Sequence, residues 1–143
     1  MLYTILKVLL TAAASSVLTV CCVQDLKSKE FSLWLAIALY ALAGANAFVS
    51  ESFIPNLISA SAVLGVLGAI SLISKQKLGL GDVLILSALV LFRGFTSGVF
   101  IFNTALVLCL VLCIVRLTVS KKKKSTETAF VPFLSIGFVM SFI

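Results

Sequence analysis

The sequence predicts an all-α membrane protein, with about six transmembrane helices packed in one bundle. Of its 143 residues, 62% are hydrophobic and 11% are charged, whereas a soluble domain has about 25% charged residues. The apolar residues form continuous runs instead of alternating, which favours helices over the strands of a membrane barrel. Helices are then the expected fold. In lipid the backbone N–H and C=O groups must bond to each other, which is possible only within helices or closed barrels.

Polar or glycine-containing links divide the chain into six apolar runs. The fourth run is too short for a level crossing, since about 20 residues are needed to span lipid. It must tilt, borrow neighbouring residues or lie partly protected inside the bundle. No linker or repeat suggests a second domain, so we expect one transmembrane domain over residues 1–143. The runs are Leu2–Val23, Phe31–Val49, Phe53–Ile73, Asp82–Phe92, Gly98–Val119 and Ala129–Ile143.

The basic residues predict how the bundle is oriented. Nine of the eleven Lys and Arg residues lie in or next to the links that the expected topology puts on one side of the membrane. The exceptions are Lys7 and Arg93. Because basic links stay in the cytoplasm, this side is expected to be cytoplasmic in a multi-pass protein of the inner (cytoplasmic) membrane. The net charge of +6 then reflects topology and contact with anionic membrane lipid, and we expect no nucleic-acid partner.

The chain has two aspartates, Asp25 and Asp82, and the expected topology places both at the cytoplasmic boundary. Two carboxyl groups that face each other cannot both ionise cheaply, so the pair retains one proton over a broad pH range. One member can take a proton from water while the other protonates a scissile carbonyl, which is aspartic protease chemistry. The alternative is that both are ordinary boundary residues, Asp82 being favoured by the dipole at a helix start.

Other catalytic schemes find less support in the composition. The chain has no histidine, which removes Ser-His, Cys-His and His-ligated zinc sites. The four cysteines lie in apolar runs without zinc-site spacing, so we expect them to be packing residues, and we expect neither a metal nor a cofactor. A Ser-Lys pair, Ser74 with Lys75 or Lys77, stays open as an alternative.

Three separated segments carry a family resemblance. Residues 79–82 read GLGD, in which Gly79 and Gly81 allow unusual backbone conformations and close approach of another chain beside Asp82. Residues 25–32 read DLKSKEFS, and residues 130–137 read FVPFLSIG. In this order the segments resemble the motifs of the type IV prepilin peptidases, a family of G-x-G-D membrane aspartyl proteases.

The resemblance implies an endopeptidase that cuts the basic leader of a prepilin, pseudopilin or flagellin-like protein at the cytoplasmic membrane face. It implies Asp25 and Asp82 as the catalytic pair and Gly79 and Gly81 as backbone elements of the active-site motif. Pro132 and its neighbour Phe133 would support the site structurally. The cytoplasmic insertion of larger members, which is associated with methyl transfer, is not found, so a minimal peptidase-only form is expected.

One departure concerns the helix that follows the first aspartate. The family usually has Ile-Pro-Asn there, where this chain has Phe31, Ser32 and Leu33. Serine can cap a helix that proline would otherwise begin, so we expect the helix start to survive. An actual Ile-Pro-Asn triplet occurs at residues 54–56, but the expected topology puts it on the outer side.

Two other functions fit the same composition. The chain could be a non-catalytic membrane scaffold or assembly factor of a pilus or secretion system. It could also be a small proton-coupled transporter that uses its two carboxylates as a relay.

Overall fold

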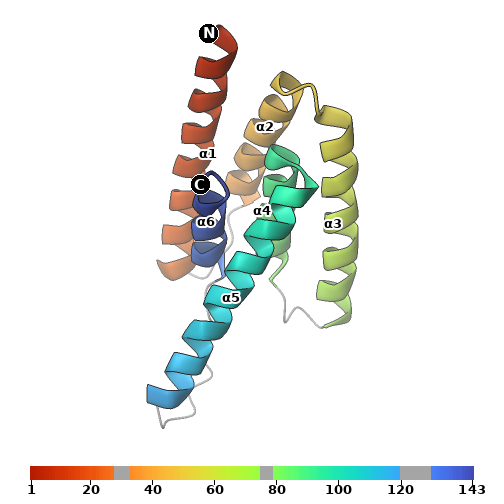
Figure 1. Ribbon diagram of the computed structural model, residues 1–143. Coiled ribbons are helices and arrows are strands. Elements are labelled where there is room, and N and C mark those ends of the chain that lie inside the picture. The colour runs from red at the N-terminus through yellow and green to blue at the C-terminus, as the bar shows by residue number, and fades with distance from the viewer. Residues whose placement is uncertain (28–32, 75–78, 120–129) are drawn as a thin grey trace.

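Six helices run alternately up and down one bundle (Figure 1). The computed structural model describes residues 1–27, 33–74, 79–119 and 130–143. These residues contain no strand, which confirms the predicted all-α class. The helices are α1 (Leu2–Lys27), α2 (Leu33–Val49), α3 (Phe53–Ile73), α4 (Leu80–Arg93), α5 (Phe95–Val119) and α6 (Val131–Met140).

Because the helices alternate in direction, the two ends of the bundle differ in what they carry. Helices α1, α3 and α5 finish at the end where α2, α4 and α6 begin (Figure 1). Both Asp25 and Asp82 belong to this end, which we call the aspartate end. Lys27 and Arg116, in the last turns of α1 and α5, also belong to it. The other basic residues of this side lie in the links outside the described residues.

The expected runs match the helices closely, and the differences are at the ends. The run Phe53–Ile73 coincides with α3. Helix α1 continues four residues past Val23, because polar residues are tolerated where a helix leaves lipid. Helix α6 is shorter than expected and ends at Met140, where Ser141 caps it by donating its backbone N–H to carbonyls of the last turn.

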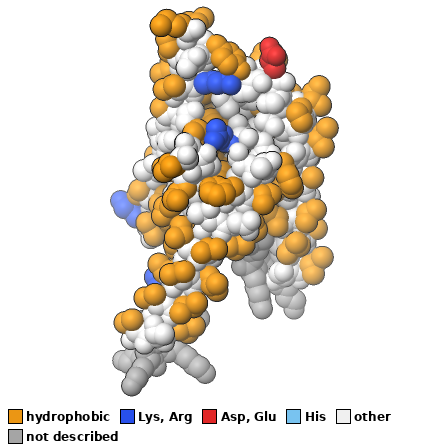
Figure 2. Space-filling model, in the orientation of Figure 1, with side chains coloured by type: hydrophobic (Ala, Val, Ile, Leu, Met, Phe, Trp, Pro, Cys, Tyr) orange, Lys and Arg blue, Asp and Glu red, His pale blue; other side chains and the backbone are white. Residues whose placement is uncertain are grey.

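Three helices, α1, α3 and α5, are long and apolar enough to cross a membrane. Helices α2 and α6 are apolar but shorter, with 17 and 10 residues. Large apolar side chains stay exposed on the outside of the bundle, and Trp34 and Leu117 are about four-fifths exposed. Figure 2 shows hydrophobic side chains along the whole length of the face in view, with few charged ones between them. Such a surface suits lipid.

Helix α4 lies between the others and has the most buried sequence of the six. Its 14 residues extend about 21 Å, less than the ~30 Å of a bilayer's hydrocarbon core. It packs against α2, α3, α5 and α6, and every residue from Ile85 to Phe92 is buried. Halfway along, the hydroxyl of Ser87 is hydrogen-bonded to that of Tyr40 on α2. Of the three possibilities left open for the fourth segment, the structure shows two: the helix extends into neighbouring residues at both ends, and it lies protected inside the bundle.

Two asparagines close the far end of α4. Asn46 of α2 is buried and donates from Nδ2 to the carbonyl of Phe92 at 2.8 Å, while Asn56 of α3 donates to the carbonyl of Leu91 at 3.2 Å. The last carbonyls of a helix have no partner within it, so these side chains satisfy groups that would otherwise be buried unpaired. Gly94, with φ of +91°, then turns the chain into α5 in a conformation that suits glycine.

Small residues let the helices approach where α5 meets its neighbours. A Cβ at Gly137 of α6 would lie 2.7 Å from the backbone oxygen of Ile101 on α5. A Cβ at Gly98 of α5 would clash with the side chain of Val90 on α4. The absence of a side chain at these two positions therefore sets the spacing of α4, α5 and α6.

We expect Gly137→Ala to lower the melting temperature of the detergent-solubilised protein. The backbone of Ile101 cannot yield as a side chain could, so α5 and α6 must separate, at a cost of about 1–3 kcal/mol for overpacking. Gly65→Ala is the matched control, because a Cβ on that α3 glycine meets nothing within 4 Å. Equal melting temperatures for the two variants would contradict this account of the packing.

Candidate active site

Asp25 continues the buried face of α1. Ala14, Leu18 and Cys21 are the buried residues of this helix, and Asp25 follows them with the same spacing of three or four residues. Residues so spaced lie on one side of a helix, so the carboxyl group points towards the bundle. Its Oδ2 atom is buried, although the residue as a whole is only half-buried. This aspartate therefore belongs to the interior of the aspartate end.

Asp82 lies in the first turn of α4, three residues after the N-cap residue Gly79. Its backbone N–H donates to the carbonyl of Gly79 at 3.1 Å. Its carboxyl group folds back over the same glycine, because a Cβ built on Gly79 would lie 3.0 Å from Oδ2 of Asp82. A negative charge is favourable at this position, where the unpaired amides of the helix start point outward.

The two aspartates lie close enough to interact electrostatically, although they come from helices that do not pack together. The charge of Asp25 acts on the carboxyl group of Asp82. Within the described residues α1 packs on α2 and α6 but makes no contact with α4, whereas α2 and α6 each contact both. Helices α2 and α6 thus separate α1 from α4, so that only side chains of α1 and α4 can approach each other. Residues 57 apart in sequence are therefore brought within electrostatic range of each other.

Helix α5 forms a further side of this region. Its Cys109 lies within the electrostatic reach of Asp82, as Cys21 and Cys22 lie within that of Asp25. All four cysteines are free, and Cys21 is part of the hydrophobic core, as expected for a packing residue. In the described ranges no three His, Cys, Asp or Glu side chains gather as metal ligands would.

The glycines of the GLGD segment do not have the unusual backbone conformations that the sequence suggested. Gly79 has φ of −61° and ψ of 127°, which any residue adopts, and Gly81 lies within α4 without a positive φ. The expectation that they supply unusual backbone conformations is therefore wrong. Gly79 matters through its missing side chain, which leaves room for the carboxyl group of Asp82.

The C-terminal motif begins α6 beside α1. Pro132 lies in the first turn of α6, where its missing N–H costs nothing, so it starts the helix and does not kink it. Phe133 packs against the hydrophobic core, and the buried Leu134 and Phe138 hold α6 in the bundle. Because α6 packs on both α1 and α5, it is placed to fix the end of α1 that carries Asp25.

The Ile-Pro-Asn triplet at residues 54–56 lies away from the aspartates. Asn56 bonds to the last turn of α4, whereas Asp82 is in its first turn, so the triplet belongs to the opposite end. Asn56 helps to close α4, which the sequence pattern alone did not reveal. Phe31 and Ser32, which replace the usual triplet, fall outside the described residues, as do Lys75 and Lys77 of the alternative Ser-Lys pair.

Comparison with known proteins gives one family. The model of the type IV leader peptidase family matches residues 12–114, a range that includes both aspartates and the GLGD segment. Neither curated proteins nor solved structures give a significant match.

We expect Asp25→Asn and Asp82→Asn each to stabilise the protein at alkaline pH, because each variant leaves one carboxyl group where two like charges would repel each other. Removing one of two partly buried like charges relieves repulsion worth about 1 kcal/mol in such surroundings. The double variant should gain less than the sum of the two single variants, because the repulsion can be removed only once. Unfolding free energies of the four proteins measure this, and strictly additive effects would mean that the carboxyl groups do not interact.

Proposed function

Because the chain belongs to the type IV leader peptidase family, we propose that it is an aspartic endopeptidase that cleaves the leader peptide of a prepilin-like protein. The observation that carries the proposal is that Asp25 and Asp82, from different helices, lie at the same end of the bundle and within electrostatic range of each other. These are two of the three acidic side chains among the described residues, and the third, Glu51, is exposed in the link between α2 and α3 at the opposite end.

The pair can activate water without a covalent intermediate. With one proton shared between the two groups, the ionised aspartate takes a proton from water while the oxygen of that water attacks the scissile carbonyl carbon. The protonated aspartate gives its proton to the carbonyl oxygen, and a neutral gem-diol forms. When the C–N bond breaks, the first aspartate protonates the leaving nitrogen and a diol hydroxyl returns a proton to the second. The pair then holds one proton again.

Each supporting element has a part in this reaction. Gly79 leaves space beside the carboxyl group of Asp82 and exposes backbone along which a substrate strand could lie. Pro132 and Phe133 begin the helix that braces the end of α1, so they act as structural support and do not touch the reacting atoms. Gly81 would contribute to the motif through its backbone.

The family points to a substrate that carries a leader peptide, and the position of the site at one end of an apolar bundle suits a precursor that lies partly in the membrane. A prepilin, pseudopilin or flagellin-like precursor has a hydrophobic segment after its basic leader, so it could lie in lipid beside the helices while the cleaved bond reaches the aspartate end. By the distribution of basic residues this end faces the cytoplasm, with the protein in the inner membrane. Residues 1–143 would form one peptidase domain without need of a cofactor.

We expect leader cleavage to require both aspartates. In liposomes with a panel of prepilin-type substrates, Asp25→Asn and Asp82→Asn should each reduce the rate by about 10²–10⁴-fold, because each removes one of the two proton-transfer groups. Glu51→Gln is the matched control and should cut at the wild-type rate, since it removes an exposed carboxylate at the other end. Melting temperatures verify that all variants are folded.

The same assay separates the other two functions. If both asparagine variants cut as fast as wild type, the aspartic mechanism is wrong. If wild type cuts no substrate but carries protons in vesicles and either asparagine variant abolishes that flux, the chain is a transporter. If wild type neither cuts a substrate nor carries protons, and neither asparagine variant changes pilus or secretion function, the scaffold interpretation holds.

A further inference from the structure

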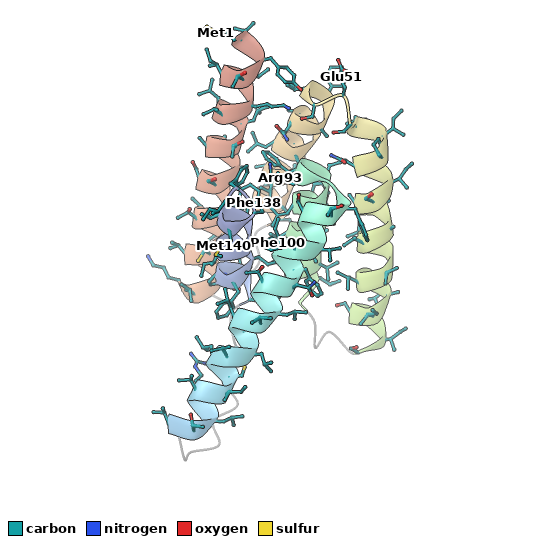
Figure 3. The ribbon with its side chains drawn as sticks, in the orientation of Figure 1. Met1, Glu51, Arg93, Phe100, Phe138 and Met140 are labelled. Atoms are coloured by element: carbon teal, nitrogen blue, oxygen red, sulfur yellow. The ribbon has the colours of Figure 1, made fainter. Side chains whose placement is uncertain are left out.

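Lys7 and Arg93, the two basic residues that are not on the side of the other nine, lie at the end of the bundle opposite to the aspartates. Lys7 of α1 and Arg93 of α4 line one cavity of about 640 Å³, together with side chains of α2, α3 and the C-terminal Phe142. In Figure 3 Arg93 lies at the end of α4, within the bundle and below the level of Met1. Figure 2 shows two groups of blue atoms near each other on the upper half of the face in view.

Arg93 is held in place but not neutralised. Its Nη2 donates to the backbone carbonyl of Ser141 at 2.7 Å, and its guanidinium lies over the ring of Phe142 at 4.1 Å from the centroid. These contacts fix the orientation of the planar group. Its Nε is buried and has no hydrogen-bond partner among the described residues. A donor that stays unpaired is costly unless a ligand accepts from it.

Lys7 adds a second cation to the same cavity. Its Nζ lies 4.4 Å from the centroid of the Tyr3 ring. No carboxylate in the described part of the chain pairs with Lys7 or Arg93, and Glu51, the acidic side chain described at this end, lines a different cavity. Two cations that share a cavity without an anion repel each other, and the arrangement becomes favourable when an anion binds between them.

The rest of the lining suits the headgroup of a lipid. Hydroxyl side chains, including those of Thr4 and Ser50, line the same cavity and can donate hydrogen bonds to a phosphate. Just outside, α1 exposes apolar side chains such as Ile5 and Leu9, along which acyl chains could pack. Guanidinium and ammonium groups are the usual partners of phosphate, and basic pockets between transmembrane helices bind lipid headgroups.

We propose that this cavity binds the phosphate group of an anionic phospholipid from the leaflet that faces away from Asp25 and Asp82. The lipid would fill space between α1 and α4, which do not pack on each other within the described residues, and it would thereby stabilise the bundle. The proposal is independent of the peptidase mechanism, because it involves neither aspartate.

Delipidated full-length protein in detergent tests the proposal. Short-chain phosphatidylglycerol, phosphatidylcholine and inorganic phosphate are titrated separately, and the melting temperature and the lipid retained in native mass spectrometry are recorded. We expect phosphatidylglycerol to bind at least fivefold more tightly than phosphatidylcholine. Lys7→Gln and Arg93→Gln should each weaken that binding about fivefold. The control Arg116→Gln, on α5 at the aspartate end, should bind as wild type.

Lys7→Gln keeps the test decisive should Arg93→Gln fail to fold, since within the described residues the Lys7 ammonium lies over the exposed ring of Tyr3 and the Lys7 backbone carbonyl accepts from Thr11 in the same helix. Equal binding of the two lipids would overturn the proposal, and so would an equal loss in Arg116→Gln, which would indicate unspecific attraction. Saturation by inorganic phosphate at the same concentration as phosphatidylglycerol would overturn the lipid assignment and leave a site for free phosphate.

Discussion

The enclosure of α4 is the constraint on which the rest of the structure depends. A helix of 14 residues is too short to cross the hydrocarbon core, so each of its ends must be protected by other helices. At its C-terminal end Asn46 and Asn56 satisfy the free carbonyls, and at its N-terminal end Asp82 occupies the first turn. Short length thus brings an ionisable side chain inside the bundle instead of leaving it at the membrane surface.

The candidate site follows from the way α1 and α4 are held. They do not pack on each other within the described residues, and α2 and α6 lie against both. The carboxyl groups of Asp25 and Asp82 can therefore interact across the interval between α1 and α4, where the two helices do not pack on each other. The close contacts of Gly98 and Gly137 keep α4, α5 and α6 in the register that this arrangement requires.

Much of this arrangement is predictable from the sequence, because lipid restricts the possible structures so strongly. The apolar runs predict six helices, and the shortness of the run Asp82–Phe92 predicts that this segment tilts, extends or lies protected inside the bundle. The two aspartates were candidates because carboxylates are rare and costly in such a chain. Both arguments need only local sequence and the properties of the bilayer.

What the sequence could not predict depends on contacts between distant helices. Asn46 and Asn56 look like ordinary polar residues until the end of α4 is placed beside them. The cavity that unites Lys7 and Arg93 arises from residues 86 apart, and no pattern connects them. For Gly79 the reason given from the sequence was wrong, since its backbone conformation is ordinary and the space beside it is occupied by the carboxyl group of Asp82.

The most direct test of the central claim, that Asp25 and Asp82 face each other, is cross-linking of Asp25→Cys with Asp82→Cys by a short bifunctional thiol reagent. The four native cysteines are first replaced by alanine, and Val23→Cys with Asp82→Cys is the control, because Val23 is exposed about half a turn away on α1. The account predicts an intramolecular cross-link for the first pair in the folded protein and little for the control. Equal cross-linking of both pairs, or none for the first, would contradict it.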